Sequence, residues 1–192
     1  MSALDIASVR LAVPPGAVLW GPAELPAAVQ VGVPLPRRAE RRFRRSVARL
    51  HRRAAGLEGL VAVVAHPYPR TGRVLVSGHV RLVDLSDAES PSPSEYATER
   101  EHAQPPRRVE ELARSVELDQ LGPGQGVLEV SIRRRPWTGV IDNLFSWAVF
   151  PTGAAIAALV ELHTTDGACC QLATEDAFTL ADSLQLVHED AR

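Results

Sequence analysis

Glu161 and His163 are the closest approach to an acid–base pair in this sequence. They stand two residues apart in a segment with the alternation of a β-strand, so both side chains point to one face of a sheet. A carboxylate beside an imidazole can transfer protons in a cleft, which makes the pair the candidate for an enzyme. The alternative is a solvated strand end whose other face is buried. We expect the solvated strand end and no catalytic residue.

Other motifs for catalysis, metal binding or cofactor binding are missing or out of context. The six histidines and the adjacent Cys169 and Cys170 have no metal-binding spacing. The glycine-rich loop 122–126 lies between a predicted helix and a strand, the reverse of the order in dinucleotide-binding proteins. No serine lies in a G-x-S-x-G nucleophile elbow. We therefore expect no enzyme, no metal and no cofactor, and the sequence indicates no small-molecule substrate.

The basic segment 37–53 is the strongest chemical feature, because it holds nine arginines and one acid, Glu40, for a local charge of +8. Apolar residues recur in it at spacings of three and four, which predicts an amphipathic helix over 37–55. Three interpretations stay open: a solvated face, a docking surface for an acidic partner, or contacts to nucleic-acid phosphates. The arginines that we expect to bind a partner lie opposite the apolar stripe: Arg38, Arg41, Arg45, Arg49 and Arg52.

A second basic cluster, Arg133-Arg134-Arg135-Pro136-Trp137, combines arginines with an aromatic side chain at a predicted turn. Tryptophan is a frequent anchor of protein interfaces. We expect Arg134, Arg135 and Trp137 to contribute to partner binding.

The composition indicates one domain over 1–192, since 45% of the chain is hydrophobic and 23% is charged. The helices and strands of this domain must position the residues described above. Helices are predicted at 37–55, 109–116 and 167–187. Strands are predicted in several short N-terminal pieces, among them 27–33, and at 60–65, 73–85, 127–134, 144–150 and 154–164. Most of the strands join as hairpins. The fold class is α+β, with a largely antiparallel sheet covered by helices.

The segment 86–108 is rich in proline and serine and lacks apolar side chains, so we expect a mobile insertion. Its neighbourhood, 84–101, carries a charge of −5. We expect this acidic segment to lie transiently over the arginine helix and to compete with an anionic partner there, and phosphorylation of Ser90 or Ser92 to strengthen that contact.

The overall charge of −2 gives no field that would drive the whole protein onto nucleic acid or membranes. The longest uncharged run, 144–160, is interrupted by Pro151 and Gly153, so we expect no transmembrane segment. The N-terminus has no signal-peptide pattern and the two cysteines are adjacent, which favours a cytoplasmic protein.

The segment 56–187 resembles small actinobacterial proteins of the PsbP-like α/β-sandwich superfamily, which includes DcrB-like proteins. The resemblance rests on 53–56 leading into strand 60–65, on Gly124-Gln125-Gly126-Val127, and on Trp147-Ala148-Val149-Phe150-Pro151. It continues through 157–166 and 178–186. It implies a non-enzymatic protein-interaction module, an adaptor or chaperone of a secretion or envelope system, with a protein partner of acidic character. Polyanion or nucleic-acid binding through helix 37–53 is the alternative, and an enzyme using Glu161 and His163 is the third hypothesis.

Overall fold

The computed structural model describes residues 6–24, 34–86 and 90–188. The strand expected at 27–33 lies outside these residues. The helices are α1 (Arg37–Ala54), α2 (Pro93–His102) and α3 (Cys170–Asp182), and a 3-10 turn at Gly167–Cys169 precedes α3. The strands are β1 (Ile6–Arg10), β2 (Val18–Trp20), β3 (Leu60–Pro67), β4 (Val74–Asp84), β5 (Glu110–Gln120), β6 (Gly124–Arg134), β7 (Ile141–Pro151), β8 (Ile156–Thr164) and β9 (Gln185–His188).

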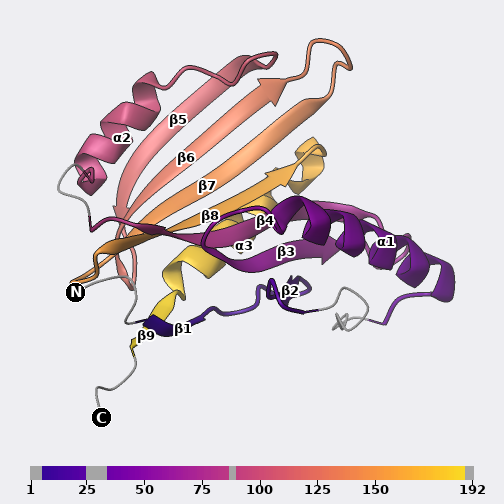
Figure 1. The fold of residues 1–192 in the computed structure, drawn as a ribbon. Helices are drawn as coiled ribbons and strands as arrows, with labels where there is room; N and C mark the ends of the chain where they lie inside the picture. The colour runs from indigo at the N-terminus through magenta and orange to yellow at the C-terminus, as the bar shows by residue number, and fades with distance from the viewer. Residues whose placement is uncertain (1–5, 25–33, 87–89, 189–192) are drawn as a thin grey trace.

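Seven strands form one antiparallel sheet in the order β2-β3-β4-β8-β7-β6-β5 (Figure 1). After β4 the chain crosses to the far edge of the sheet, where β5 begins. It then returns strand by strand through β6 and β7, until β8 pairs with β4. The predicted α+β class, with a single domain and a largely antiparallel sheet covered by helices, is confirmed. β1 and β9 form a separate two-stranded ribbon.

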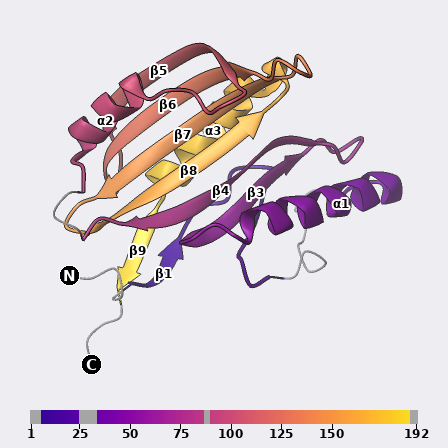
Figure 2. The same ribbon diagram turned by 45° about the horizontal axis from the view of Figure 1, so that its top comes forward.

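The three helices cover both faces of the sheet. On β3, Val63 and Ala65 pack in a cluster with the apolar stripe of α1, whereas Ala62 and Val64 belong to the larger core under α3. Cross-strand partners share a face, and Val63 is linked through such partners to Glu129, which binds α2. α1 and α2 therefore lie on one face and α3 on the other, as Figure 2 shows.

The region expected to be a mobile insertion contains a docked helix. Ser92 caps α2 in a reciprocal arrangement with Glu95, and Pro93 occupies the first turn. Tyr96 of α2 packs edge-on against Phe150 of β7, with ring centroids 5.7 Å apart. α2 lies over β5 and β6, away from α1 (Figure 1). In this structure Pro93–His102 therefore does not cover the arginine helix.

Two predicted helices were wrong in type or extent. The segment predicted as helix 109–116 belongs to β5, because pairing with β6 outweighs the helix preference of its Glu, Leu, Ala and Arg residues. Most of this edge strand is exposed, and its charged side chains discourage pairing with another sheet. The C-terminal helix ends at Asp182 rather than near 187, since Gln185–His188 pairs with β1.

None of the described helices is both long and apolar enough to cross a membrane. Cys169 and Cys170 lie at the start of α3, and both are free thiols.

The turn between β3 and β4 supports α1 through a close backbone approach, which yields a stability prediction. A Cβ at Gly72, where φ is +64°, would overlap the backbone of Ala39 in α1. Gly139 has a similar φ of +66° in the β6–β7 turn, with no atom within 4 Å of such a Cβ. Gly139→Ala should therefore cost only the left-handed backbone penalty of about 1–2 kcal/mol. Gly72→Ala should lower the free energy of unfolding in urea by clearly more. Equal losses in both variants would contradict the contact with α1.

Candidate functional site

A row of polar side chains crosses the face of the sheet that α1 and α2 flank. His79 of β4 lies opposite Glu161 of β8, which lies opposite Ser146 of β7. One step along the strands, Ser77 of β4 lies opposite His163 of β8. Direct cross-strand neighbours have Cβ atoms about 5 Å apart, so these polar groups are close enough to interact. The pairing of β4 with β8 thus assembles residues that are distant in sequence.

Glu161 and His163 lie on one face, as the strand pattern predicted, but each is bonded to a different group. Glu161 Oε2 lies 2.9 Å from His79 Nε2. Hydrogen bonding by His79 lowers the pKa of Glu161, although burial opposes the shift. His163 instead faces Ser77 and Asp142. The candidate acid–base pair of Glu161 with His163 is therefore not a pair that the structure contains.

His163 links a serine to a carboxylate. Its Nε2 lies 3.2 Å from Ser77 Oγ, and its Nδ1 lies 3.5 Å from Asp142 Oδ1. Asp142 also accepts a hydrogen bond of 3.0 Å from Arg135 Nη2. Burial raises the pKa of Asp142, but His163 and Arg135 together bring the pKa below its usual value, so the carboxylate is ionised. The order of groups is serine, histidine, carboxylate and arginine.

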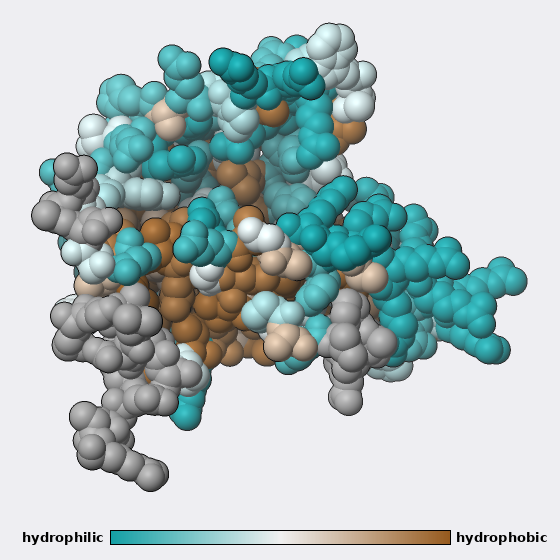
Figure 3. All heavy atoms as spheres, viewed as in Figure 1, coloured by the Kyte–Doolittle hydropathy of each residue, from teal (hydrophilic) through white to brown (hydrophobic). Residues whose placement is uncertain are grey.

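Ser77 lines a cleft between α1 and the sheet, with a volume of about 520 Å³. Figure 3 shows hydrophilic side chains projecting from α1 at the right, whereas apolar side chains gather in the middle of this view. A smaller pocket of about 170 Å³ shares Leu50 and Arg53 with the cleft and reaches His163. The residues that line the cleft are Arg42, Arg45, Ser46, Arg49, Leu50, Arg53, Arg73, Val74, Ser77 and Thr165.

Five arginines of this cleft have no acidic partner among the residues that the structure describes. Four of them come from α1 and the fifth is Arg73, at the start of β4. In the described part of α1, the ion pair is that of Arg44 with Glu40, 2.9 Å apart. Five like charges around one hollow repel one another, and an anion would remove that repulsion. The cleft is therefore an anion site by charge, and its hydroxyl groups add further polar contacts.

The predicted arginine face overlaps this cleft only in part. All five arginines are exposed, but only Arg45 and Arg49 line the cleft, whereas Arg38, Arg41 and Arg52 do not. Sequence reasoning missed Arg42, Arg53 and Arg73. The first two share a helical stripe with Arg45 and Arg49, at spacings of three and four, directly beside the apolar stripe. The sequence shows that spacing. The tertiary fold decides which side of the apolar stripe faces β4.

The second predicted cluster lies at the tip of the β6–β7 hairpin, near the same end of the molecule as α1 (Figures 1 and 2). Its arginines are paired, Arg134 with Glu110 of β5 and Arg135 with Asp142 of β7. Trp137 is 86% exposed, and Val140 and Ile141 beside it are also exposed. This tip is apolar, with its neighbouring charges already neutralised.

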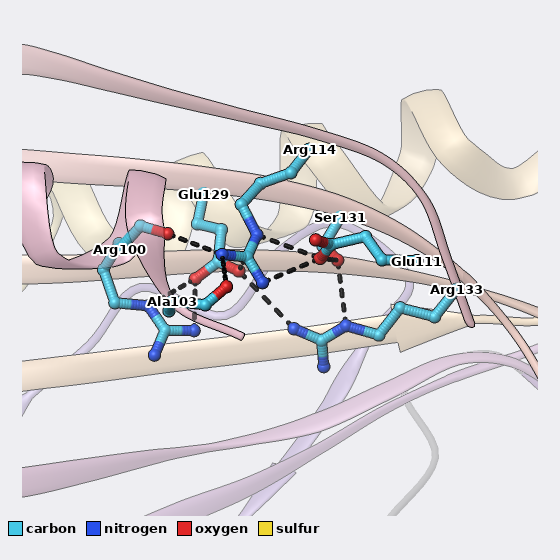
Figure 4. A network of polar contacts seen from close by, with 7 residues as sticks. All are labelled: Arg100, Ala103, Glu111, Arg114, Glu129, Ser131 and Arg133. Carbon is cyan, nitrogen blue, oxygen red and sulfur yellow. Dashed lines mark hydrogen bonds and ion pairs between the residues drawn. The ribbon is translucent and has the colours of Figure 1, made fainter. Parts of the chain in front are cut away.

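A second charged cluster, around Glu129, differs from the cleft because its charges are matched (Figure 4). The carboxylate of Glu129 is 4% exposed and receives Arg100 of α2 at 2.6 Å. Arg133 and Arg114 lie 3.4 and 3.6 Å from it, and Arg114 also pairs with Glu111 at 2.8 Å. Arg114 further donates to the carbonyl oxygens of Arg100 and Ala103, at the end of α2. The network fixes α2 to the sheet and offers no unpaired charge to a ligand.

Comparisons with known proteins do not assign the site. The sequence matches no protein-family model and no curated protein. In the described ranges, no three His, Cys, Asp or Glu side chains cluster as metal ligands would. The resemblance to PsbP-like and DcrB-like proteins therefore stays a prediction, and the arguments about function rest on the cleft itself.

The buried position of Glu129 leads to a second stability prediction. Glu129→Gln should lower the free energy of unfolding by about 3 kcal/mol, because it removes the negative charge that three arginines share in a dry site. Glu110→Gln is the matched control, since Glu110 and Arg134 are both about half exposed. The free energy of unfolding of Glu110→Gln should fall by less than about 1 kcal/mol. Urea unfolding measures both. Comparable losses would show that the Glu129 network is not what holds α2.

Proposed function

We propose that this protein binds an anionic ligand in the arginine-lined cleft between α1 and β4. The observation that carries the proposal is the convergence of five arginines without acidic partners among the described residues. Guanidinium groups bind carboxylates and phosphates through paired hydrogen bonds, and they are less strongly hydrated than ammonium groups. The cleft volume of about 520 Å³ is within the range of small-molecule sites.

Local structure supports this assignment over a merely solvated basic face. The arginines extend from the same helix that buries Phe43 and Val47 against the sheet, so their backbone positions are fixed by core packing. Side chains on a fixed backbone lose less conformational entropy on binding than side chains on a mobile segment. Ser46, Ser77 and Thr165 place hydroxyl groups among the guanidinium groups. The cleft thus offers both charge and directional hydrogen bonds to an anion.

A protein partner that docks on the β6–β7 hairpin is the second candidate. It is the function that the sequence resemblance implies, as an adaptor or chaperone of a secretion or envelope system. The observation that favours it is the exposed Trp137 beside Val140 and Ile141, since clustered exposed apolar side chains mark interfaces. The hairpin lies near the end of the molecule that carries the cleft, so one partner of acidic character could contact both.

The cleft proposal predicts the effect of removing its arginines. Inorganic triphosphate serves as the probe, with binding measured by calorimetry at low ionic strength. The double variant Arg45→Gln/Arg49→Gln should weaken binding at least about tenfold, because one charge-assisted hydrogen bond contributes about 1.5 kcal/mol or more. Arg38→Gln/Arg41→Gln removes the same charge from the same helix outside the cleft, and should leave the affinity nearly unchanged.

Duplex DNA as a second probe separates the cleft from nucleic-acid binding by the whole arginine face. If α1 bound DNA with that face, both double variants would weaken DNA binding alike, and each would reduce its salt dependence. Equal effects of the two variants on triphosphate would overturn the cleft as the binding site.

The hairpin candidate predicts that Trp137→Ala removes a protein partner. In pull-downs at native expression, a partner that binds the hairpin should be recovered with the unaltered protein and lost with Trp137→Ala, because truncating an interface tryptophan typically costs 2 kcal/mol or more, roughly thirtyfold in affinity. Leu118→Ala, an exposed apolar change on β5, is the control and should keep the partner. Recovery that is the same with both variants would exclude the hairpin.

A further inference from the structure

We propose that Ser77 is a nucleophile and that Ser77, His163 and Asp142 form a hydrolytic site for esters that carry an anionic group. The inference rests on the proposed function for its substrate class, because the arginines would select the anionic group. It departs from the sequence expectation of a non-enzymatic protein. It also pairs His163 with Ser77 and Asp142, the partners that the strand register provides, rather than with Glu161.

The connectivity of the three groups is that of a serine hydrolase. Asp142 lies on the Nδ1 side of His163, and Ser77 lies on the Nε2 side. An ionised Asp142 favours the tautomer that carries its proton on Nδ1, which leaves Nε2 free to accept the proton of Ser77. Arg135 holds the other oxygen of Asp142 at 3.0 Å. Arg135 thus orients Asp142, whose Oδ1 faces His163 Nδ1 at ion-pair distance without making a hydrogen bond.

The strand pairing explains how three distant residues meet. Ser77 and His163 are direct cross-strand neighbours on β4 and β8. Leu144 is the partner of His163 on β7, and Asp142 lies two residues before it, on the same face of the sheet. All three side chains therefore emerge from paired strands rather than from loops, which keeps their separations fixed.

Ser77 is largely buried, at 6% exposed, and His163 is the more accessible of the two. Ser77 lines the arginine cleft, His163 lines the smaller pocket beside it, and the side chain of His163 is 41% exposed. An ester whose anionic group contacts Arg45 or Arg49 can bring its carbonyl carbon toward Ser77 Oγ. Binding of the anionic group by the arginines would thus place the ester bond next to Ser77.

The reaction needs only the ester and water. Ser77 Oγ attacks the carbonyl carbon while its proton passes to His163 Nε2. The bond from that carbon to the alcohol oxygen then breaks, and the alcohol leaves with the proton from His163. Water repeats the sequence on the acyl-serine, which releases the carboxylic acid and restores Ser77.

Stabilisation of the negative oxygen would come from arginine side chains. β4 is paired on both sides, with Ala65 opposite Ser77 on β3 and His163 opposite it on β8. Its backbone N–H groups are therefore engaged in the sheet. Arg53 and Arg73 line the same cleft as Ser77 and offer guanidinium donors for the oxygen that becomes negative.

Covalent labelling tests the nucleophile without depending on the arginines. The folded protein is incubated with an uncharged alkyl fluorophosphonate, and the modified residue is located by mass spectrometry. We expect one addition, at Ser77, that is absent in Ser77→Ala. His163→Gln should slow the labelling about a hundredfold, because it removes the general base. Ser146→Ala is the matched control, since Ser146 is 8% exposed against 6% for Ser77 and lies on the same sheet face outside the cleft, and it should be labelled normally.

Hydrolysis of two esters tests the substrate class. The 4-nitrophenyl half-ester of glutaric acid carries a carboxylate, whereas 4-nitrophenyl butyrate is neutral. We expect the charged ester to be the better substrate at low salt, by about tenfold in kcat/KM, and this preference to disappear in Arg45→Gln/Arg49→Gln. Ser77→Ala should reduce hydrolysis of both to the rate without protein.

The outcomes separate this inference from the anion-binding function. No label at Ser77, or hydrolysis of the charged ester by Ser77→Ala at the unaltered rate, would overturn the nucleophile. Triphosphate binding by the unaltered protein together with an inert Ser77 would leave an anion-binding protein that is not a hydrolase. Thermal unfolding of each variant distinguishes a lost function from a lost fold.

Discussion

The pairing of β4 with β8 is the constraint on which the rest of the structure depends. It closes the strand sequence β5-β6-β7-β8 against the hairpin of β3 and β4, and so makes one sheet from two parts of the chain. The two strands approach closely at Gly78, where a Cβ would overlap the carbonyl oxygen of Glu161. The same contact sets His79 opposite Glu161 and Ser77 opposite His163. The pairing that closes the core therefore also brings the polar side chains together.

Charge on the α1 and α2 face is arranged in two different ways. Around Glu129, arginines from α2, β5 and β6 converge on one buried carboxylate, and such a cluster is stable only when its members are all paired. Under α1, arginines converge without an acid among the described residues. Repulsion there costs stability, and the apolar packing of Phe43 and Val47 offsets that cost. The first arrangement holds a helix in place, and the second leaves a positively charged hollow beside α1.

Local patterns in the sequence predicted what depends on local physics. The apolar spacing of Ala39, Phe43 and Val47 gave α1 almost to the residue, and alternation gave most of the hairpins. β5 was missed because its helix-favouring residues become a strand only through pairing with β6. α2 was missed because its own apolar content is low, and it is held by Tyr96 on Phe150 and by Arg100 on Glu129. Both errors arise from contacts between segments that the sequence does not place together.

The same distinction between local patterns and contacts of distant segments explains which part of the site the sequence predicted. The arginines of 37–53 are a run in one segment, so composition and helical spacing were enough to mark them. Ser77, Asp142 and His163 come from three strands, and a shift of β8 by one residue would turn His163 to the α3 face. The core prevents that shift, because Val160 and Leu162 would then leave the apolar cluster for the polar face. The hydrophobic register of β8, read for its buried side chains, therefore also fixes the direction of the histidine that joins serine to carboxylate.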